Sequence, residues 1–168
     1  MQRRALLALM VSSTAVGLGG CGFALRKAPN FAFTTLYSSL AESSSLGVEL
    51  RRSLESTHKV RVITDAREIN EAQVIFDALL DQREKVVLSL NSSGQVREFQ
   101  LRLRFSFRLR TLAGKELIPA TEIALQRDIS FNESAVLAKE AEEALLYRDM
   151  QSDVVQQIMR RLAAVTAL

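Results

Sequence analysis

Residues 99–110 alternate apolar and polar side chains without exception. The apolar members are Phe99, Leu101, Leu103, Phe105, Phe107 and Leu109, and the polar members are Gln100, Arg102, Arg104, Ser106, Arg108 and Arg110. Because successive side chains of a strand point to opposite faces, this pattern predicts a strand with one buried face and one solvated face. A sheet that is buried on one face needs a second layer over that face.

The segments on either side of this strand predict its neighbours. The preceding strand is expected to add a second apolar row to the same face, formed by Val74, Phe76, Ala78, Leu80, Val86, Leu88 and Leu90. Polar residues 81–85 interrupt that row, so a β-bulge or a break could occur there. The cluster 91–94 predicts a hairpin turn. Further strands are expected over 31–37 and 121–131, with Arg127 breaking the last apolar row, and 60–63 could form a small extra strand.

Two helices are expected to cover the buried face. Ser43, Ser44 and Ser45 are N-cap candidates for a helix that continues to about residue 56. Its apolar stripe is formed by Leu46, Leu50 and Leu54, which recur every four residues. A second helix is expected over 135–164, where an apolar face is formed by Leu137, Ala141, Ala144, Leu145, Val154, Val155, Ile158, Met159 and Leu162. Its length of about 45 Å matches the roughly 43 Å of strand 98–110. The sequence therefore predicts an α+β fold, a two-layer sandwich of two helices on a mostly antiparallel four-stranded sheet.

The N-terminus has the features of a bacterial lipoprotein precursor. Arg3 and Arg4 precede an apolar run that is shorter than the roughly 20 residues needed to span a bilayer. The run ends in Leu18-Gly19-Gly20-Cys21, which resembles a lipobox, in which the Cys thiol is acylated and becomes the mature N-terminus. The alternative is an ordinary signal peptide with an incidental Cys. The predicted organisation is a signal peptide (1–20), a lipidated N-terminus and tether (21–30) and a single α+β domain (31–168).

Signal-peptide removal changes the charge balance. The full chain has 22 basic and 19 acidic residues and a net charge of +3. Loss of Arg3 and Arg4 leaves 20 basic residues against 19 acidic ones, so no nucleic-acid partner is indicated. Two or more acyl chains on Cys21 make membrane attachment stable. By resemblance to enterobacterial lipoproteins, which are retained at the inner membrane by an Asp after the Cys, Gly22 indicates the outer membrane.

Enzyme and metal chemistry have little support in the sequence. One His and one Cys are too few for a multi-His or multi-thiolate metal site. No nucleophile–base constellation, Walker motif or dinucleotide motif occurs. We therefore expect no enzyme activity, no cofactor and no metal, and the missing nucleophile nearly eliminates a lipid-anchored hydrolase.

Short motifs follow the lipobox in a specific order, namely 21–26, 98–101, 116–119, 135–143, 148–150 and 157–162. In this order they resemble the lipopolysaccharide-assembly lipoprotein family LptE over nearly the whole mature chain. The resemblance implies a two-helix, four-stranded sandwich that serves as plug and assembly partner of the LptD β-barrel. It also implies lipopolysaccharide binding and delivery to the cell surface by a protein that is anchored in the outer membrane through Cys21 and faces the periplasm and barrel lumen.

Basic residues are the candidates for contact with lipopolysaccharide phosphates, because Arg binds phosphate bidentately and Lys binds it as a point charge. The candidates are Lys139, Arg127 and Arg97. Lys139 ranks first because the matching family motif holds a lipopolysaccharide-contacting Lys, although it could instead pair with Glu143 at i+4. Arg127 and Lys139 flank one turn and are expected to converge. The family's other basic contact lies at the hairpin tip, where this chain has no basic residue, so that contact is missing or displaced to Arg97.

Four arginines on the solvated strand face form a candidate partner interface, and they are Arg102, Arg104, Arg108 and Arg110. A wide barrel has a polar interior, so a plug should present such a face. The alternative is that these side chains only solvate an exposed sheet, and alternation alone does not separate the two. A second function class also stays open, an outer-membrane lipoprotein accessory to an ABC-type lipid transport system.

The lipobox interpretation predicts the effect of Cys21→Ala. This substitution removes the acyl acceptor, so cells should accumulate unprocessed precursor with no diacylglyceryl mass and no outer-membrane pool. Membrane fractionation and mass spectrometry measure both quantities. An unchanged outer-membrane distribution would contradict the lipoprotein interpretation.

Overall fold

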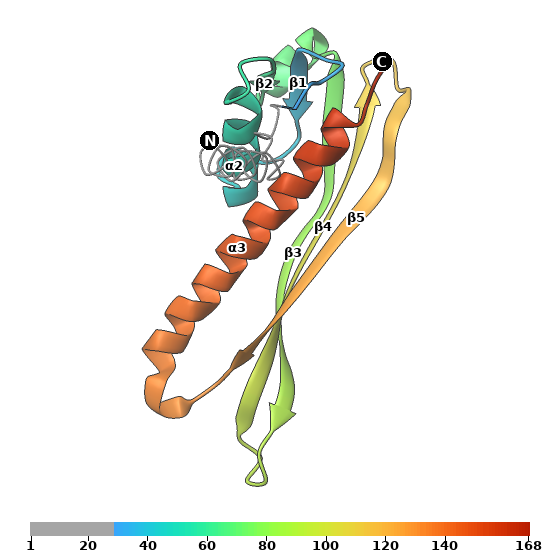
Figure 1. The fold of residues 1–168 in the computed structure, drawn as a ribbon. Helices are drawn as coiled ribbons and strands as arrows, with labels where there is room; N and C mark the ends of the chain where they lie inside the picture. Colours follow the sequence, from blue (N-terminus) through green and yellow to red (C-terminus); the bar gives the residue numbers. More distant parts are fainter. Residues whose placement is uncertain (1–28) are drawn as a thin grey trace, which may run out of the picture.

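The computed structural model describes residues 29–168, so the predicted signal peptide, Cys21 and nearly all of the predicted tether lie outside the described residues. The elements in chain order are β1 (Thr35–Ser38), α2 (Ser45–Glu55), β2 (Arg61–Ile63), the 3-10 helix η2 (Ala66–Glu71), β3 (Val74–Leu90), β4 (Val96–Thr111), β5 (Glu116–Ser130), the 3-10 helix η3 (Glu133–Ala135) and α3 (Val136–Ala163). Both α-helices lie on one face of the sheet (Figure 1). The broad α+β prediction is confirmed.

The sheet has five strands in the order β2-β1-β3-β4-β5, so the prediction of four strands is wrong. The additional strand is the 61–63 segment, which pairs in parallel with β1. Helix α2 connects β1 to β2, and such a crossover is how two parallel neighbours are joined. β3 pairs in parallel with the other side of β1, and β3, β4 and β5 are antiparallel. The sequence pattern indicated this segment as a possible small strand, but it was not counted in the predicted four-stranded sheet.

Strand β4 supplies the centre of the core, as its alternation predicted. Its five fully buried side chains, all 0 % exposed, are Leu101, Leu103, Phe105, Phe107 and Leu109. The rings of Phe105 and Phe107 stack on Phe76 of β3, with centroids 6.3 and 5.0 Å away. The intervening polar side chains point to the opposite, open face of the sheet, so the predicted register of β4 is correct.

A β-bulge changes the register of β3. The pairing with β4 shifts between Ala78 and Leu80, and the strand then continues through residues 81–85 without a break. After the bulge Leu80 pairs with Ser106 and Val86 with Gln100, so both lie on the open face. The predicted continuation of the core row through Leu80 and Val86 is therefore wrong, because one extra residue moves the side chains that follow it to the opposite face. Instead, Arg83 and Lys85 face the helices. The register shifts again between Val87 and Leu90, where Leu88 and Leu90 are exposed and also lie outside the core.

Helix α2 forms where the sequence predicted it. The Ser44 hydroxyl accepts a hydrogen bond from the Gly47 backbone N–H at 3.2 Å, as an N-cap does. Leu46, Leu50 and Leu54 form its buried stripe. The helix therefore covers the end of the sheet where β1, β2 and the start of β3 lie (Figure 1).

Helix α3 is buried over only half of its length. Its buried residues all lie from Met150 onward, whereas Leu137 is 82 % exposed and Leu145 is 54 % exposed. The expected apolar face of the first half therefore does not join the core. The fully buried row of β4 reaches only to Leu101, and beyond it the apolar side chains of the sheet that face the first turns of α3 line an open hollow instead of packing closely against the helix. The similar lengths of the helix and the strand do not determine how much of the helix is buried.

A polar network fixes α3 at the start of its buried half. The Arg83 guanidinium donates to Gln151 Oε1 at 2.8 Å and to Ser45 Oγ at 3.2 Å. The Gln151 amide donates to Glu49 Oε2 at 2.6 Å. Gln151 is 6 % exposed, so these bonds satisfy a buried amide. The network joins β3, α2 and α3 at one height of the sandwich.

The register of β4 makes a pair of adjacent substitutions informative. Phe105→Ala should destabilise the fold by about 3–5 kcal/mol, because it leaves a cavity at a fully buried site. Arg104→Ala should leave the unfolding midpoint nearly unchanged, because that side chain lies on the open face. Urea unfolding of both variants measures the difference. A larger loss for Arg104→Ala would contradict the register.

Candidate functional site

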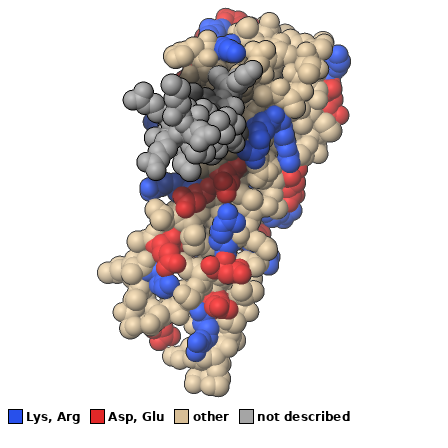
Figure 2. Space-filling model, in the orientation of Figure 1, with Lys and Arg blue, Asp and Glu red and all other residues tan. Residues whose placement is uncertain are grey.

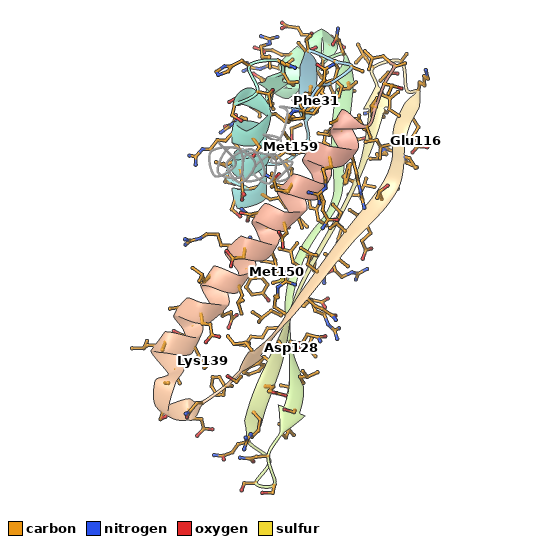
Figure 3. All side chains as sticks on the ribbon, in the orientation of Figure 1. Phe31, Glu116, Asp128, Lys139, Met150 and Met159 are labelled. Atoms are coloured by element: carbon orange, nitrogen blue, oxygen red, sulfur yellow. The ribbon has the colours of Figure 1, made fainter. Side chains whose placement is uncertain are left out.

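Lys139 lies where β5 turns into α3, at the end of the molecule opposite α2 (Figure 3). Its ammonium donates to Ser130 Oγ at 3.0 Å and to Glu142 Oε2 at 2.8 Å. Glu143, the partner in the alternative interpretation of Lys139, instead pairs with Lys85 of β3, with 2.6 Å between Nζ and Oε2. Lys139 does form an ion pair within its own helix, but with the carboxylate at i+3 and not with the one at i+4. The Lys139 side chain is 22 % exposed.

An apolar hollow of about 240 Å³ lies beside Lys139, between β4, β5 and the first turns of α3. Its apolar lining is formed by Phe99, Ile129, Phe131 and Val136. The Phe99 and Phe131 rings meet edge to face at 5.3 Å. Lys85 and Lys139 also line the hollow, and the Lys85 ammonium lies 4.3 Å from the Phe99 ring centroid. The hollow thus combines aromatic walls with two ammonium groups and with the carboxylates of Glu140 and Glu143.

A polar hollow of about 410 Å³ lies on the other side of Ser130 and Phe131, which line both hollows. Its other lining residues come from the hairpin end and from the turn before α3, and they are Asn91, Gln95, Val96, Arg97, Glu98, Asn132 and Glu133. Arg97, a predicted contact residue, therefore lies within the same end of the molecule as Lys139. The hairpin tip itself carries no basic side chain.

Arg127 does not converge with Lys139. Its guanidinium lies 3.3 Å from Asp153 Oδ2 on α3, which is 14 residues along the helix from Lys139 and hence about 21 Å away along its axis. Arg127 pairs across the sheet with Leu101, so it occupies the helix-facing side of β5. The break that it makes in the apolar row therefore accommodates an ion pair between sheet and helix.

The four arginines of the open sheet face form a ladder along β4, which we call the arginine ladder (Arg102, Arg104, Arg108 and Arg110). Arg104 Nε donates to Glu122 of β5 at 2.9 Å. Arg108 Nε and Arg110 Nε both donate to Asp77 Oδ2 of β3, at 2.7 and 2.8 Å. Arg102 Nε donates to Gln100 Oε1 at 2.8 Å. Acidic residues of the flanking strands therefore neutralise much of the ladder.

The ladder shifts the pKa values of its carboxylates. Burial raises the pKa of Asp77, but hydrogen bonds from Arg110 and Arg108 outweigh it, so the pKa lies below its ordinary value. The hydrogen bond from Arg104 likewise lowers the pKa of Glu122. Both carboxylates are therefore ionised over the physiological pH range, and positive and negative side chains lie next to one another on this face.

The family model for lipopolysaccharide assembly, LptE, matches residues 33–162. The chain belongs to the LptE family. The LPS-assembly lipoproteins LptE of Yersinia pestis (strain Pestoides F) and Yersinia pseudotuberculosis (serotype O:1b) are each 29% identical to it, over 98% of this chain and 79% of theirs. The LptE family is an assembly family and not an enzyme family, and its members are lipoproteins of lipopolysaccharide transport.

Solved lipoprotein structures share the fold. Lipoprotein B of Nitrosomonas europaea superposes with a TM-score of 0.71 at 36% identity, covering 85% of this chain and 91% of that one. The rare lipoprotein B of Shewanella oneidensis superposes with a TM-score of 0.65 at 24% identity, covering 78% and 95%. The second likeness bears on the fold alone.

Two further observations concern residues 29–168. Neither of the α-helices is long and apolar enough to cross a membrane. Across the same residues, His, Cys, Asp and Glu side chains form no group of three or more that could hold a metal ion.

Sequence reasoning missed Lys85 and the two hollows of this LptE-family chain. Lys85 was counted among the polar residues that interrupt a strand, and only the bulge after Ala78 turns it towards α3. A signal did exist for the apolar hollow, because Phe99 and Phe131 begin and end apolar rows that the long helix was expected to cover. Their distance from each other could not be read from the chain.

The lowered pKa of Asp77 predicts a pH-dependent stability. A carboxylate whose folded pKa lies below its unfolded value stabilises the fold above the unfolded pKa, near 4, and the contribution is lost as pH falls through the folded pKa. Asp77→Asn should therefore unfold at lower urea than wild type at pH 7, and the gap should shrink below pH about 4. Asp128→Asn is the matched control, since this carboxylate on the same face accepts from the Gln100 amide and not from an Arg. A gap independent of pH would contradict the assignment.

Proposed function

We propose that this LptE-family lipoprotein is anchored at the outer membrane through Cys21, plugs and helps assemble the LptD β-barrel, and binds lipopolysaccharide for delivery to the cell surface. Lipopolysaccharide binding is supported by the two hollows, one apolar and one polar, which share Ser130 and Phe131 as lining residues. Lipopolysaccharide combines acyl chains, sugars and phosphates in one molecule. An apolar hollow with a polar neighbour and nearby cations suits such a ligand.

Lys139 is the residue proposed to contact a phosphate. Its ammonium lies beside the start of α3, where Ala135 at the N-cap makes no side-chain capping hydrogen bond. Uncapped N–H groups of a first helical turn attract anions. A phosphate at this point would meet both the helix start and the ammonium. Lys85 and Arg97 supply further positive charge at the same end of the sandwich, whereas Arg127 is assigned to the ion pair with Asp153.

The arginine ladder is the surface proposed to face the barrel lumen. Its side chains already hydrogen-bond across three strands, so the face can present donors and acceptors to a polar wall without carrying a large net charge. Barrel interiors are polar, and charge pairs at an interface mainly fix orientation and exclude wrong partners. The helix side also carries basic and acidic atoms intermingled over its lower half (Figure 2).

Purification in mild detergent tests the partner. Full-length, tagged protein from its native membrane should retain a large β-barrel protein. Recovery of an inner-membrane ATPase system in place of a barrel would favour the accessory of an ABC-type lipid transporter. Recovery of neither would contradict the plug function.

Lys139→Glu tests the ligand site. A charge-assisted contact to phosphate contributes about 1.5–3 kcal/mol, so lipopolysaccharide affinity should fall roughly ten- to hundredfold. Titration of lipopolysaccharide against immobilised protein measures this affinity at physiological salt. Lys115→Glu is the matched control, because it makes the same charge change at the other end of the sheet, where Lys115 Nζ donates to the Leu168 carbonyl. Equal affinities for both variants would place the site elsewhere.

A further inference from the structure

The end of the β3–β4 hairpin extends beyond α3, and no helix covers it (Figure 1). The apolar side chains of its outer strand are exposed, Val86 by 38 %, Val87 by 48 %, Leu88 by 47 % and Leu90 by 58 %. We call residues 86–90 the apolar edge. From Val86 to Val96 the chain contains no charged residue, although 24% of the whole chain is charged. Exposed apolar surface without charge is typical of the centre of a protein interface.

The backbone of the apolar edge is open on its outer side. β1 pairs with β3 only at residues 74–76, and the Ala78 N–H then donates to Ser39 Oγ at 2.8 Å. Beyond Ala78, among the residues that the structure describes, the Tyr147 hydroxyl is the one group that bonds the outer side of the β3 backbone, where it donates to the Glu84 carbonyl at 2.6 Å. Residue pairs of an antiparallel ladder alternate between bonded and non-bonded, so Val86, two residues on, also directs its N–H and C=O outward.

The other long edge of the sheet is protected. β5 contains Pro119 and exposes Glu122, Gln126, Arg127 and Asp128 along its length. Proline and charge are the usual means by which an edge strand is kept from pairing. The apolar edge has neither, although its register shifts between Val87 and Leu90 curve the end of the hairpin. A contrast between two edges of one sheet indicates that the unprotected edge has a partner.

We propose that an uncharged, extended segment of the partner barrel pairs with the apolar edge as an added strand. This proposal rests on the proposed function, and it identifies which surface holds the partner and by which groups. Strand addition supplies main-chain hydrogen bonds along the edge, and exposed side chains on alternate faces give specificity. A charged segment would have to bury charge against four apolar side chains, which is unfavourable. A five-residue edge alone is too small for a stable dimer, which needs about 1,200 Å² or more, and this favours a partner that other surfaces also hold.

Val86→Pro tests the backbone contribution. Proline removes the outward N–H, and edge strands tolerate it at positions where that N–H faces solvent, as β5 tolerates Pro119. Val86→Thr is the matched control, since it retains the N–H and a β-branched shape but makes the side chain polar. Both variants are co-expressed with the barrel as full-length, tagged lipoproteins, and circular dichroism of each purified variant reports its folding. We expect Val86→Pro to lower barrel recovery roughly tenfold, as loss of a main-chain hydrogen bond and its neighbours implies, and Val86→Thr to retain most of it.

Amide hydrogen exchange of wild type gives a second measurement that does not depend on a variant. Peptides that contain residues 86–90 should exchange more slowly in the barrel complex than in free protein, while those from the β5 edge should change less. Equal barrel recovery by all three proteins, or no protection of 86–90, would overturn strand addition and leave the plug function standing. Recovery lost equally in both variants would assign the contact to the side chain and also overturn it. If the wild-type protein self-associates and Val86→Pro abolishes that association, the occupant of the apolar edge is a second copy of this chain and the inference is overturned. If the wild-type protein recovers no barrel, both the proposed function and this inference are overturned.

Discussion

Burial of one face of β4 is the constraint on which the rest of the structure depends. Five consecutive inward side chains from Leu101 to Leu109 are completely removed from water, and burying a large apolar side chain contributes about 1.5–3 kcal/mol. The helices must cover that row, and β3 and β5 must flank it. Because the alternation has a period of two, the same burial forces every intervening Arg onto the opposite face. The core and the arginine ladder are thus two results of one sequence pattern.

The apolar hollow lies where α3 continues beyond that buried row. From Met150 onward the helix packs on apolar sheet surface, while its first turns contact the sheet mainly through Lys85 with Glu143 and Lys139 with Ser130. The network of Arg83, Gln151 and Glu49 lies at the boundary between the exposed first half and the buried second half of α3. Polar contacts fill space less completely than interdigitated apolar side chains do. Room for a ligand therefore appears at the end of the sandwich where the first turns of α3 bury no side chain.

The sequence predicted the elements better than it predicted their registers. The β4 alternation and the α2 stripe at Leu46, Leu50 and Leu54 were sufficient, since each repeats one period without interruption. The β3 row failed after Ala78, because a single-residue bulge is a local backbone event with no side-chain signature of its own. Arg127 was noticed as an interruption, but its partner Asp153 is 26 residues away in sequence, and the spacing of charges cannot identify such a pair. The family motif pointed to Lys139 at the apolar hollow, and the structure adds Lys85 to the same place.

Charge pairing within the arginine ladder determines which of its arginines could contribute the most binding free energy to a partner. Arg104, Arg108 and Arg110 each have a carboxylate partner on a neighbouring strand. A carboxylate that a partner brings to one of these guanidinium groups must share it with the existing carboxylate or displace that carboxylate. Its net contribution to the binding free energy is therefore small. Among the described residues, Arg102 is the ladder member without an ion pair, since its guanidinium bonds the Gln100 amide oxygen. An incoming carboxylate could replace that neutral acceptor and form a charge-assisted bidentate pair. Specificity on this face should therefore concentrate at Arg102, midway along β4, while the paired arginines hold the surface in the geometry that presents it.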